Sequence, residues 1–285
     1  MLRKLMLMSL LAAGTALAQD TDSLSSFQYQ AAKAPVNKVV HYVKSNLDGT
    51  KRLVLSLHFG APLQVEALKV EADGRYLALV QAQLDPKTLT ESSLRSFNRL
   101  ERGKPALQMT LASDPGQRRL VASVGKAQMP VKVGHLPAHI YNFDLSGLNA
   151  TLPYLKNPRA DFDVGIVDPD FEFLRTQFKP DGGVQEGGFV DKGKATFRYL
   201  KDEVLDDIPT HRFEVGGPAF GNVKGTLWIN AKDLLIERFE HAQPDNPDWK
   251  SFKLERISEQ KMGKAAWEGF KAASIKRAAG LLEGD

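Results

Sequence analysis

Cysteine is absent from the 285 residues of this chain. Disulfide bonds, thiol catalysis and metal sites built on thiolates are therefore excluded. Stability has to come from packing alone. A chain of this length can supply it, because the share of surface that is buried on folding rises with chain length.

A strong excess of one charge is also missing. The formal net charge is only +4, and basic residues alternate with acidic ones instead of gathering into a block. Proteins that bind nucleic acid usually concentrate Lys and Arg on one face, where these residues neutralise phosphates. The sequence therefore argues against nucleic-acid binding.

Long hydrophobic runs are confined to the start of the chain. Arg3 and Lys4 precede an apolar stretch, Leu5–Ala13, and a small-x-small cleavage signal ends at Ala18. These three parts are typical of a secretory signal peptide over residues 1–18. The apolar stretch is shorter than the roughly 20 residues that a spanning helix needs. We expect cleavage after Ala18, a periplasmic or secreted protein, and no transmembrane segment in the mature chain.

The rest of the chain favours strands. Residues 19–26 are polar and Ser-rich, which predicts a disordered lead-in. The remainder predicts a mainly β fold, in which a large twisted antiparallel sheet, several sheets or a half-barrel carries two or three helices. We expect N-terminal and C-terminal antiparallel domains over residues 27–145 and 146–285. Apart from the segment around residues 210–241, the predicted strands are Val36–Lys44, Arg52–Phe59, Val65–Glu71, Tyr76–Leu84, Ala106–Ala112, Leu120–Val124, Val131–Val133, His139–Asp144, Lys194–Leu200 and Trp249–Ile257.

Two helices and one shorter helical segment interrupt the strands. From Leu94 apolar residues recur at every third position, which predicts a helix over Thr90–Arg102. Leucines within Leu148–Leu155 predict a helical turn or two. If Ser258–Leu282 forms a helix, its apolar residues lie near one face, so this segment should be a helix packed on the sheet.

The segment Thr210–His241 reads as three strands joined by two turns, because apolar and polar residues alternate along it. Its Gly-rich turn, Gly216–Asn222, is followed by a strand, whereas a phosphate-binding loop requires a helix there. Aromatic residues gather in this last third of the chain. They either fill the core or line an apolar cleft, and the candidate cleft residues are Phe213, Phe220, Trp228, Phe239 and Trp249.

Two groups of residues suggest metal sites. His135, His139 and Asp144 fall within ten residues and could bind a transition metal, although Pro137 prevents a helix from aligning the histidines. An acidic segment could bind calcium, with exposed turn carboxylates as the alternative. Its members are Asp161, Asp163, Asp168, Asp170 and Glu172.

The segment from Lys194 to Ile257, with GTLWINAKDLLIERFEH inside it, resembles the late strands of the periplasmic lipoprotein-carrier (LolA/LolB-like) group. The likeness is a tryptophan strand, a polar turn and an apolar strand with charged partners, and it covers the C-terminal third only. It implies a twisted half-barrel that holds acyl chains. This chain is longer, and no binding residue of that group maps onto a position here.

Three functional hypotheses follow. No Gly-x-Ser-x-Gly motif or other catalytic signature is present, which favours a non-enzymatic protein that binds an apolar or amphiphilic ligand, such as a lipid or lipoprotein, or an envelope partner. A metal-dependent hydrolase using His135 to Asp144 is the second hypothesis. A structural or interaction module of the cell envelope is the third. No cofactor is required by the first hypothesis.

Overall fold

The computed structural model describes residues 22–71, 77–101, 104–114, 117–141 and 146–282. The predicted signal peptide, residues 19–21 of the predicted lead-in and Asp144 lie outside these ranges, whereas Ser23–Ser26 of the lead-in form a 3-10 helix. The described part is built around one open, mixed sheet of fifteen strands. This confirms the predicted mainly β fold with a large sheet and a few helices.

The strands follow each other across the sheet in the order β8-β7-β6-β5-β4-β3-β2-β1-β15-β14-β13-β12-β11-β10-β9. We call β1 to β8 the N-terminal wing; its strands are β1 Lys38–Ser45, β2 Leu53–Ala61, β3 Gln64–Glu71, β4 Leu77–Leu84, β5 Glu91–Glu101, β6 Lys104–Asp114, β7 Arg119–Val124 and β8 Ala127–Lys132. We call β9 to β15 the C-terminal wing; its strands are β9 Ala138–Ile140, β10 Phe162–Pro169, β11 Phe189–Leu205, β12 Ile208–Gly216, β13 Gly225–Asn230, β14 Ile236–His241 and β15 Phe252–Lys261.

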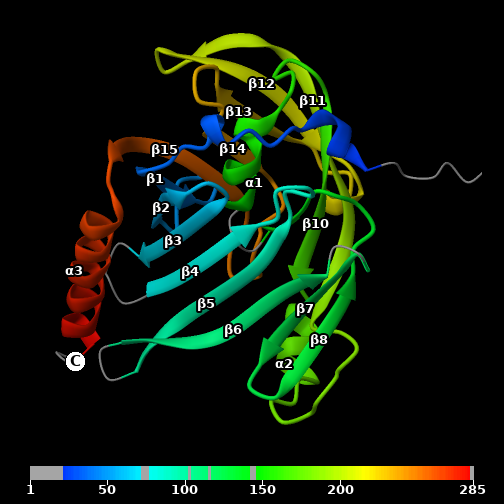
Figure 1. Cartoon of the computed structure of the whole chain (residues 1–285), viewed down its shortest axis with the longest axis vertical. Coiled ribbons are helices and arrows are strands. Elements are labelled where there is room, and N and C mark those ends of the chain that lie inside the picture. Colours follow the sequence, from blue (N-terminus) through cyan, green and yellow to red (C-terminus); the bar gives the residue numbers. More distant parts are fainter. Residues whose placement is uncertain (1–21, 72–76, 102–103, 115–116, 142–145, 283–285) are drawn as a thin grey trace, which may run out of the picture.

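Neighbouring strands pair antiparallel throughout, except for the parallel pair of β9 and β10. The two wings are joined by pairing of β1 with β15, so the start and the end of the strand series meet in the middle of the sheet. The sheet curls strongly, so that the far edge of the N-terminal wing approaches β10 and β11 (Figure 1). Gln128 N of β8 donates to Gly183 O at 2.8 Å, which ties this edge to the segment before β11.

Helices lie on both faces of the sheet. The α-helices are α1 Ser146–Thr151, α2 Phe171–Thr176 and α3 Lys264–Leu282, and the 3-10 helices are η1 Ser23–Ser26, η2 Ala31–Lys33, η4 Leu152–Tyr154 and η5 Pro218–Phe220. Figure 1 shows α1 inside the curl of the sheet and α3 outside it. The division into domains at residues 145 and 146 stays a prediction.

The three strands predicted within residues 210–241 are confirmed as β12, β13 and β14, with η5 in the Gly-rich turn. Gly217 in this turn has a φ of +96°, and a Cβ there would lie 2.6 Å from Lys194 O. Only glycine meets both conditions at low cost. The turn is therefore a strand connection whose glycine content is explained by backbone geometry.

The predicted helix over Thr90–Arg102 is wrong, because β5 occupies this segment. Leu94 is buried on the inner face of the strand. Phe97 lies on the opposite face, where the Arg95 guanidinium carbon lies 5.2 Å from the centroid of the Phe97 ring. Apolar residues spaced by three thus serve two faces of one strand. Pairing with β4 and β6 outweighs the local helical pattern, since β5 is central in its wing.

Two predicted boundaries also shift. The strand predicted at Val131–Val133 is β8, which begins earlier, at Ala127, and includes Pro130. This strand forms an edge of the sheet, where a residue without an N–H is tolerated. The final helix begins at Lys264 instead of Ser258, because β15 continues to Lys261 in order to pair with β1.

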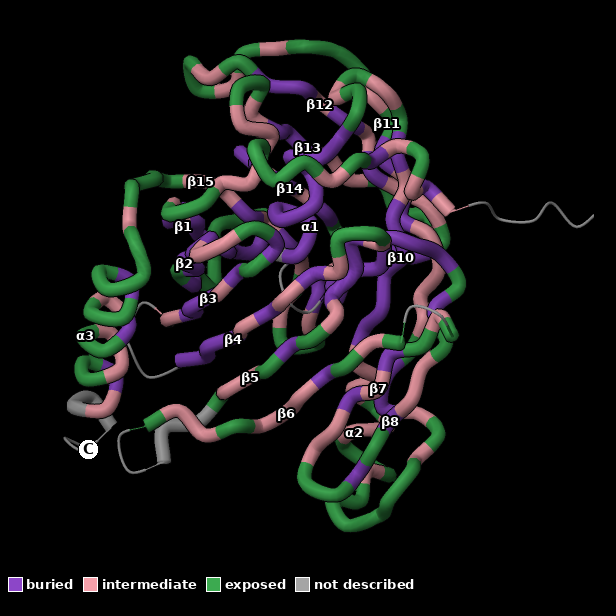
Figure 2. Tube along the Cα trace, viewed as in Figure 1, coloured by how far each residue is buried: buried purple, intermediate pink, exposed green. Residues whose placement is uncertain are grey.

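The main core fills the inner side of the curl, where buried positions concentrate (Figure 2). Within it, Leu148, Leu152 and Leu155 are all buried, which confirms the predicted helical turns. The buried side chain of Asn149 fixes α1 in place. Its Oδ1 accepts hydrogen bonds from Ile236 N at 3.0 Å and from the Tyr42 hydroxyl at 3.2 Å. Helix α1 therefore fills one end of the concavity.

Helix α3 covers the outer face of the N-terminal wing, as the sequence predicts. Trp267 is fully buried and stacks on His58 with ring centroids 4.9 Å apart. Lys271 Nζ donates to Glu66 Oε2 at 2.7 Å. Among the described helices none is both long and apolar enough to cross a membrane.

Ion pairs reinforce the junction of β1 with β15, which we call the seam. Arg256 of β15 contacts Asp233 at 3.1 Å and Glu237 at 2.8 Å, and Lys38 of β1 contacts Asp233 at 2.9 Å. Burial is the largest single influence and would raise the pKa of Asp233, but the hydrogen bonds and charge of Arg256, with the hydrogen bonds from Lys38 and Leu235 N, together hold this pKa below its usual value. The seam thus links strands that are far apart in sequence.

Candidate functional site

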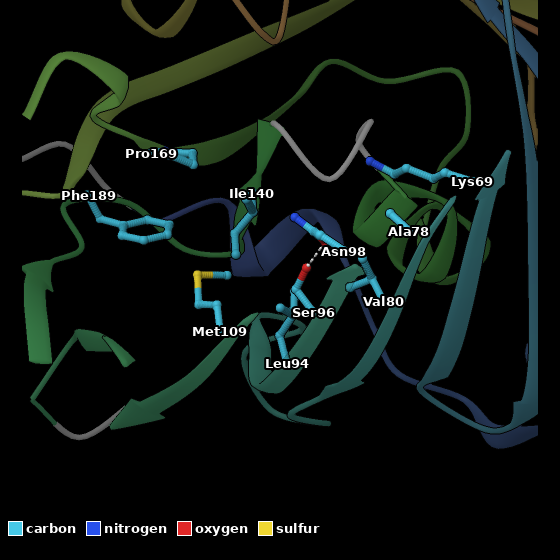
Figure 3. Close-up of a pocket in the computed structure, with 10 residues that line it drawn as sticks. All are labelled: Lys69, Ala78, Val80, Leu94, Ser96, Asn98, Met109, Ile140, Pro169 and Phe189. Atoms are coloured by element: carbon cyan, nitrogen blue, oxygen red, sulfur yellow. Dashed lines mark hydrogen bonds between the residues drawn. The ribbon is translucent and has the colours of Figure 1, made fainter. Parts of the chain in front are cut away.

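A cleft with both apolar and polar lining residues lies in the concavity, where the two wings face each other across the end that α1 leaves unfilled. It is partly open to solvent and has a volume of about 70 Å³. Figure 3 shows side chains from both wings pointing toward one space. The lining residues are Lys69, Ala78, Val80, Leu94, Ser96, Asn98, Met109, Ile140, Pro169 and Phe189.

The floor of the cleft comes from strands that are covered on both faces. In β4 the residues Leu77 to Val80 are all buried. Leu77 packs outward in the cluster under α3, whereas Ala78 and Val80 line the cleft. An uninterrupted apolar run is expected when a strand is covered on both sides. Small side chains at the inward positions leave the space that the cleft occupies.

Polar groups lie on one wall of the cleft. The Ser96 hydroxyl donates to Asn98 Oδ1 at 2.8 Å, and both residues lie on β5 (Figure 3). Lys69 of β3 is buried and lies at the opposite end of the labelled set from Phe189 (Figure 3). The cleft therefore combines an apolar floor with polar side chains, which suits a ligand that has an apolar part and a polar part.

Two contacts, which we call the clasp, hold the wings together beside the cleft. The hydroxyl of Thr90 accepts a hydrogen bond from Ala138 N at 2.9 Å. Glu91 Oε1 lies 3.5 Å from His139 Nδ1, and both side chains are almost fully buried. The pairing register of β4 with β5 shifts by a residue between Gln83 and Leu84. This irregularity lets the side chain of Glu91 point inward, where it is buried beside the core.

The geometry of the clasp leaves little room. A Cβ placed on Gly147 of α1 would lie 2.2 Å from Glu91 Oε1 and 2.8 Å from His139 Nδ1. Within the described residues neither Glu91 oxygen accepts a hydrogen bond, and its close polar contact is with His139. The clasp is thus a tight, water-poor contact between β5, β9 and α1.

Three of the predicted cleft aromatics lie in the packed core. Phe213, Phe220 and Phe239 are fully buried. Phe213 contacts Phe162 edge-on with centroids 5.4 Å apart, and Phe239 contacts Phe252 at 5.2 Å. None of the three lines the cleft described above. Ligand binding by these residues stays a prediction.

The two predicted tryptophans lie elsewhere. Trp228 Nε1 donates to Glu203 Oε1 at 2.6 Å, and the Arg212 guanidinium lies over its ring. Trp249 contacts Lys44, whose ammonium lies 4.3 Å from a ring centroid. The structure therefore does not bring the five predicted aromatic residues together into one surface.

The candidate transition-metal residues have separate surroundings. His135 Nε2 lies 3.3 Å from Ser23 Oγ, while His139 faces Glu91. Asp144 lies outside the described residues. Across the part of the chain that the structure describes, no three His, Asp or Glu side chains come together as a possible metal site. The three-residue site stays a prediction.

The acidic residues proposed for calcium are distributed over different contacts. Asp161 Oδ1 accepts from Tyr199 N at 2.9 Å, and Asp163 pairs with Lys194 at 3.6 Å. Asp170 caps α2 by accepting from Phe173 N, and Glu172 pairs with Arg175 on the same helix. Asp168 is buried. These contacts give each exposed carboxylate a local structural partner.

Sequence reasoning missed the residues that line the cleft. The sequence prediction relied on bulky aromatic residues, which lie in the C-terminal wing. The cleft is instead lined by Ala78, Val80 and other small or flexible residues of the N-terminal wing. The run Leu77 to Val80 carried the available signal, since it indicates a strand covered on two sides. The opposite wall, from Ile140 and Phe189, could be found only from the fold.

A second, wider hollow of about 260 Å³ shares Pro169 with the cleft. It is bordered by the ends of β10 and β11, by Phe171 of α2 and by the chain from Gln243 to Pro247. All of these segments belong to the C-terminal wing or its connections, whereas residues of both wings line the smaller cleft. The smaller cleft is therefore the candidate for a ligand held between the wings.

Comparison with known proteins gives structural neighbours only. No protein-family model and no curated protein matches the sequence. A β-barrel-like protein of domain of unknown function DUF1849 from Brucella abortus matches with a TM-score of 0.38 and 8% identity, covering 79% of this chain and 96% of that one. The hypothetical lipoprotein YmcC from Escherichia coli matches with a TM-score of 0.31 and 11% identity, covering 81% and 90%.

A third solved structure is a putative outer membrane lipoprotein-sorting protein domain from Vibrio parahaemolyticus. It matches with a TM-score of 0.23 and 11% identity, covering 86% of this chain and 94% of that one. The lipoprotein-sorting group that the C-terminal strands resemble is thus represented among the structural neighbours. At these identities and TM-scores the function has to be argued from the cleft itself.

Proposed function

We propose that this protein is a non-enzymatic carrier or sensor of an apolar or amphiphilic ligand, such as a lipid, and that the ligand binds in the cleft between the two wings. The observation that carries the proposal is that apolar Val80, Leu94 and Ile140 line the same cleft as polar Ser96 and Asn98. An alkyl chain would gain free energy from the floor, because it leaves water there.

The surroundings of the cleft support binding over catalysis. Among the described residues, the side chains that line it include no histidine, aspartate or glutamate. Its polar members are a hydroxyl, an amide and the ammonium of Lys69, which can orient a ligand but do not form a nucleophile with an adjacent base. We place the protein in the periplasm or outside the cell, on the strength of the signal peptide expected at residues 1–18.

A titration with a dansyl-labelled fatty acid tests this proposal. We expect the dansyl emission to rise and shift to shorter wavelength as the probe enters the cleft. Val80→Phe places a ring in the cleft and should weaken binding about tenfold or more, which corresponds to about 1.4 kcal/mol. Val54→Phe is the matched control, because Val54 is 39% exposed on β2 and does not line the cleft.

Native mass spectrometry of the exported protein provides an independent measurement. A co-purifying lipid mass that is lost in Val80→Phe and retained in Val54→Phe would support the cleft as the site. No emission change with the wild-type protein, together with a ligand-free mass, would overturn the proposed function. Equal binding by both variants would place the ligand elsewhere on the molecule.

A further inference from the structure

The size of the cleft and the clasp beside it together limit what can enter. For scale, an engineered cavity of about 150 Å³ takes a single benzene ring. The cleft has a volume of about 70 Å³. That space accommodates a short stretch of one slim chain, and two chains side by side do not fit.

The clasp prevents the cleft from widening easily. Glu91 starts the strand β5 that carries Leu94, Ser96 and Asn98, Thr90 directly precedes it, and their partners Ala138 and His139 precede Ile140 on β9. The contacts at 2.9 Å and 3.5 Å therefore join the two walls within four residues of the cleft. Moving the walls apart would break the hydrogen bond from Ala138 N to Thr90 and separate Glu91 from His139, so widening the cleft costs the polar contacts that join its walls.

We infer that the cleft admits the end of one alkyl chain at a time, and that the clasp of Thr90 and Glu91 with Ala138 and His139 sets this limit. The favoured ligand class is a single-chain amphiphile, such as a fatty acid or a lysophospholipid, in preference to a diacyl phospholipid. This inference rests on the proposed function. Thr90 and Glu91 act in it as positioning residues that fix the distance between the walls.

Competition against the dansyl-labelled fatty acid tests the inference. The competitors are monolauroyl lysophosphatidylcholine and dilauroyl phosphatidylcholine, which share head group and chain length and differ in chain number. With the wild-type protein we expect the lysophospholipid to displace the probe at least about tenfold more effectively. Equal displacement by both lipids would overturn single-chain selection and leave the proposed function standing, since the probe itself would still bind.

Variants then test the role of the clasp. Thr90→Val removes the acceptor of Ala138 N, and Glu91→Gln removes the carboxylate charge while keeping the side-chain shape. We expect either change to reduce the preference for one chain by raising the affinity for the diacyl lipid, with lysophospholipid binding retained. Circular dichroism identifies any variant that does not fold, and one folded variant suffices. An unchanged preference in a folded variant would overturn the assignment of the clasp.

Discussion

The two wings of the sheet use their inner faces differently. The C-terminal wing fills its concave side with phenylalanine rings, such as Phe162 stacked on Phe197 with centroids 4.6 Å apart. The N-terminal wing presents small aliphatic residues, including Ala78 and Val80, on the corresponding side. Large rings pack to the density of a crystal and leave no space, whereas small side chains on a curved sheet leave a cleft. Aromatic rings therefore mark the core of the C-terminal wing, whereas small aliphatic residues of the N-terminal wing border the candidate site, with Phe189 on its opposite wall.

The largest loss of stability should come from removing an aromatic ring from the core of the C-terminal wing. Phe213→Ala removes a fully buried ring that contacts Phe162, and we expect a loss of about 3–5 kcal/mol in the free energy of unfolding. Leu94→Ala in the other wing should cost about 2 kcal/mol, at the low end for such changes, since Leu94 already borders a cavity. Urea denaturation of both variants measures the difference. Equal losses would show that the wings are packed alike.

A smaller effect is expected at the seam, where the wings meet. Arg256 is 8% exposed and bridges Asp233 and Glu237. Arg256→Met removes the cation between these two carboxylates, which then keep Lys38 and Asn230 as their side-chain partners. We expect a loss of about 3 kcal/mol. Arg175→Met removes an exposed pair with Glu172 and serves as the control, with little change expected. A variant Arg256→Met as stable as the control would show that the seam relies on strand pairing alone.

The smallest effect concerns the outer face of the N-terminal wing. Burial lowers the pKa of His58, which faces Glu66, Glu268 and Lys271, below its ordinary 6.5. A lowered pKa means that the unfolded chain binds the proton more readily, so stability is present above pH 6.5 and falls as the pH drops below it. His58→Phe should keep the stacking on Trp267 and lessen this loss.

Urea midpoints at pH 7.5 and pH 5.5 for the wild-type protein and His58→Phe measure this effect. Burial also lowers the pKa of His41 and His241, so part of the pH dependence should remain in the variant. An identical pH dependence in both proteins would show that His58 does not contribute to it.

Much of the strand pattern could be read from local sequence, because it depends on neighbours along the chain. Alternation over Thr210–His241 predicted three strands that the structure contains. The same reasoning failed for β5, where Leu94 and Phe97 serve opposite faces. A spacing of three cannot distinguish a helix from a strand with apolar residues on both faces, since pairing with β4 and β6 decides the outcome.

The candidate site was beyond the reach of sequence for a related reason. Its walls come from β3 to β6 and from β9 to β11, which approach each other only because the sheet curls. The clasp likewise joins Glu91 to His139, which are 48 residues apart along the chain by number. His139 was noticed as a possible metal ligand, yet its partner in the structure is a carboxylate on a distant strand.

By itself the sequence determined the absence of thiol chemistry, the dominance of strands and the position of most turns, since composition and local alternation are properties of the chain. Tertiary structure alone decided that β1 pairs with β15, that the aromatic residues of the C-terminal wing fill a core, and that small residues of the N-terminal wing border a cleft. These outcomes depend on how a twisted sheet curls around α1. That curvature is a sum over many strand pairs and is not encoded in any one segment.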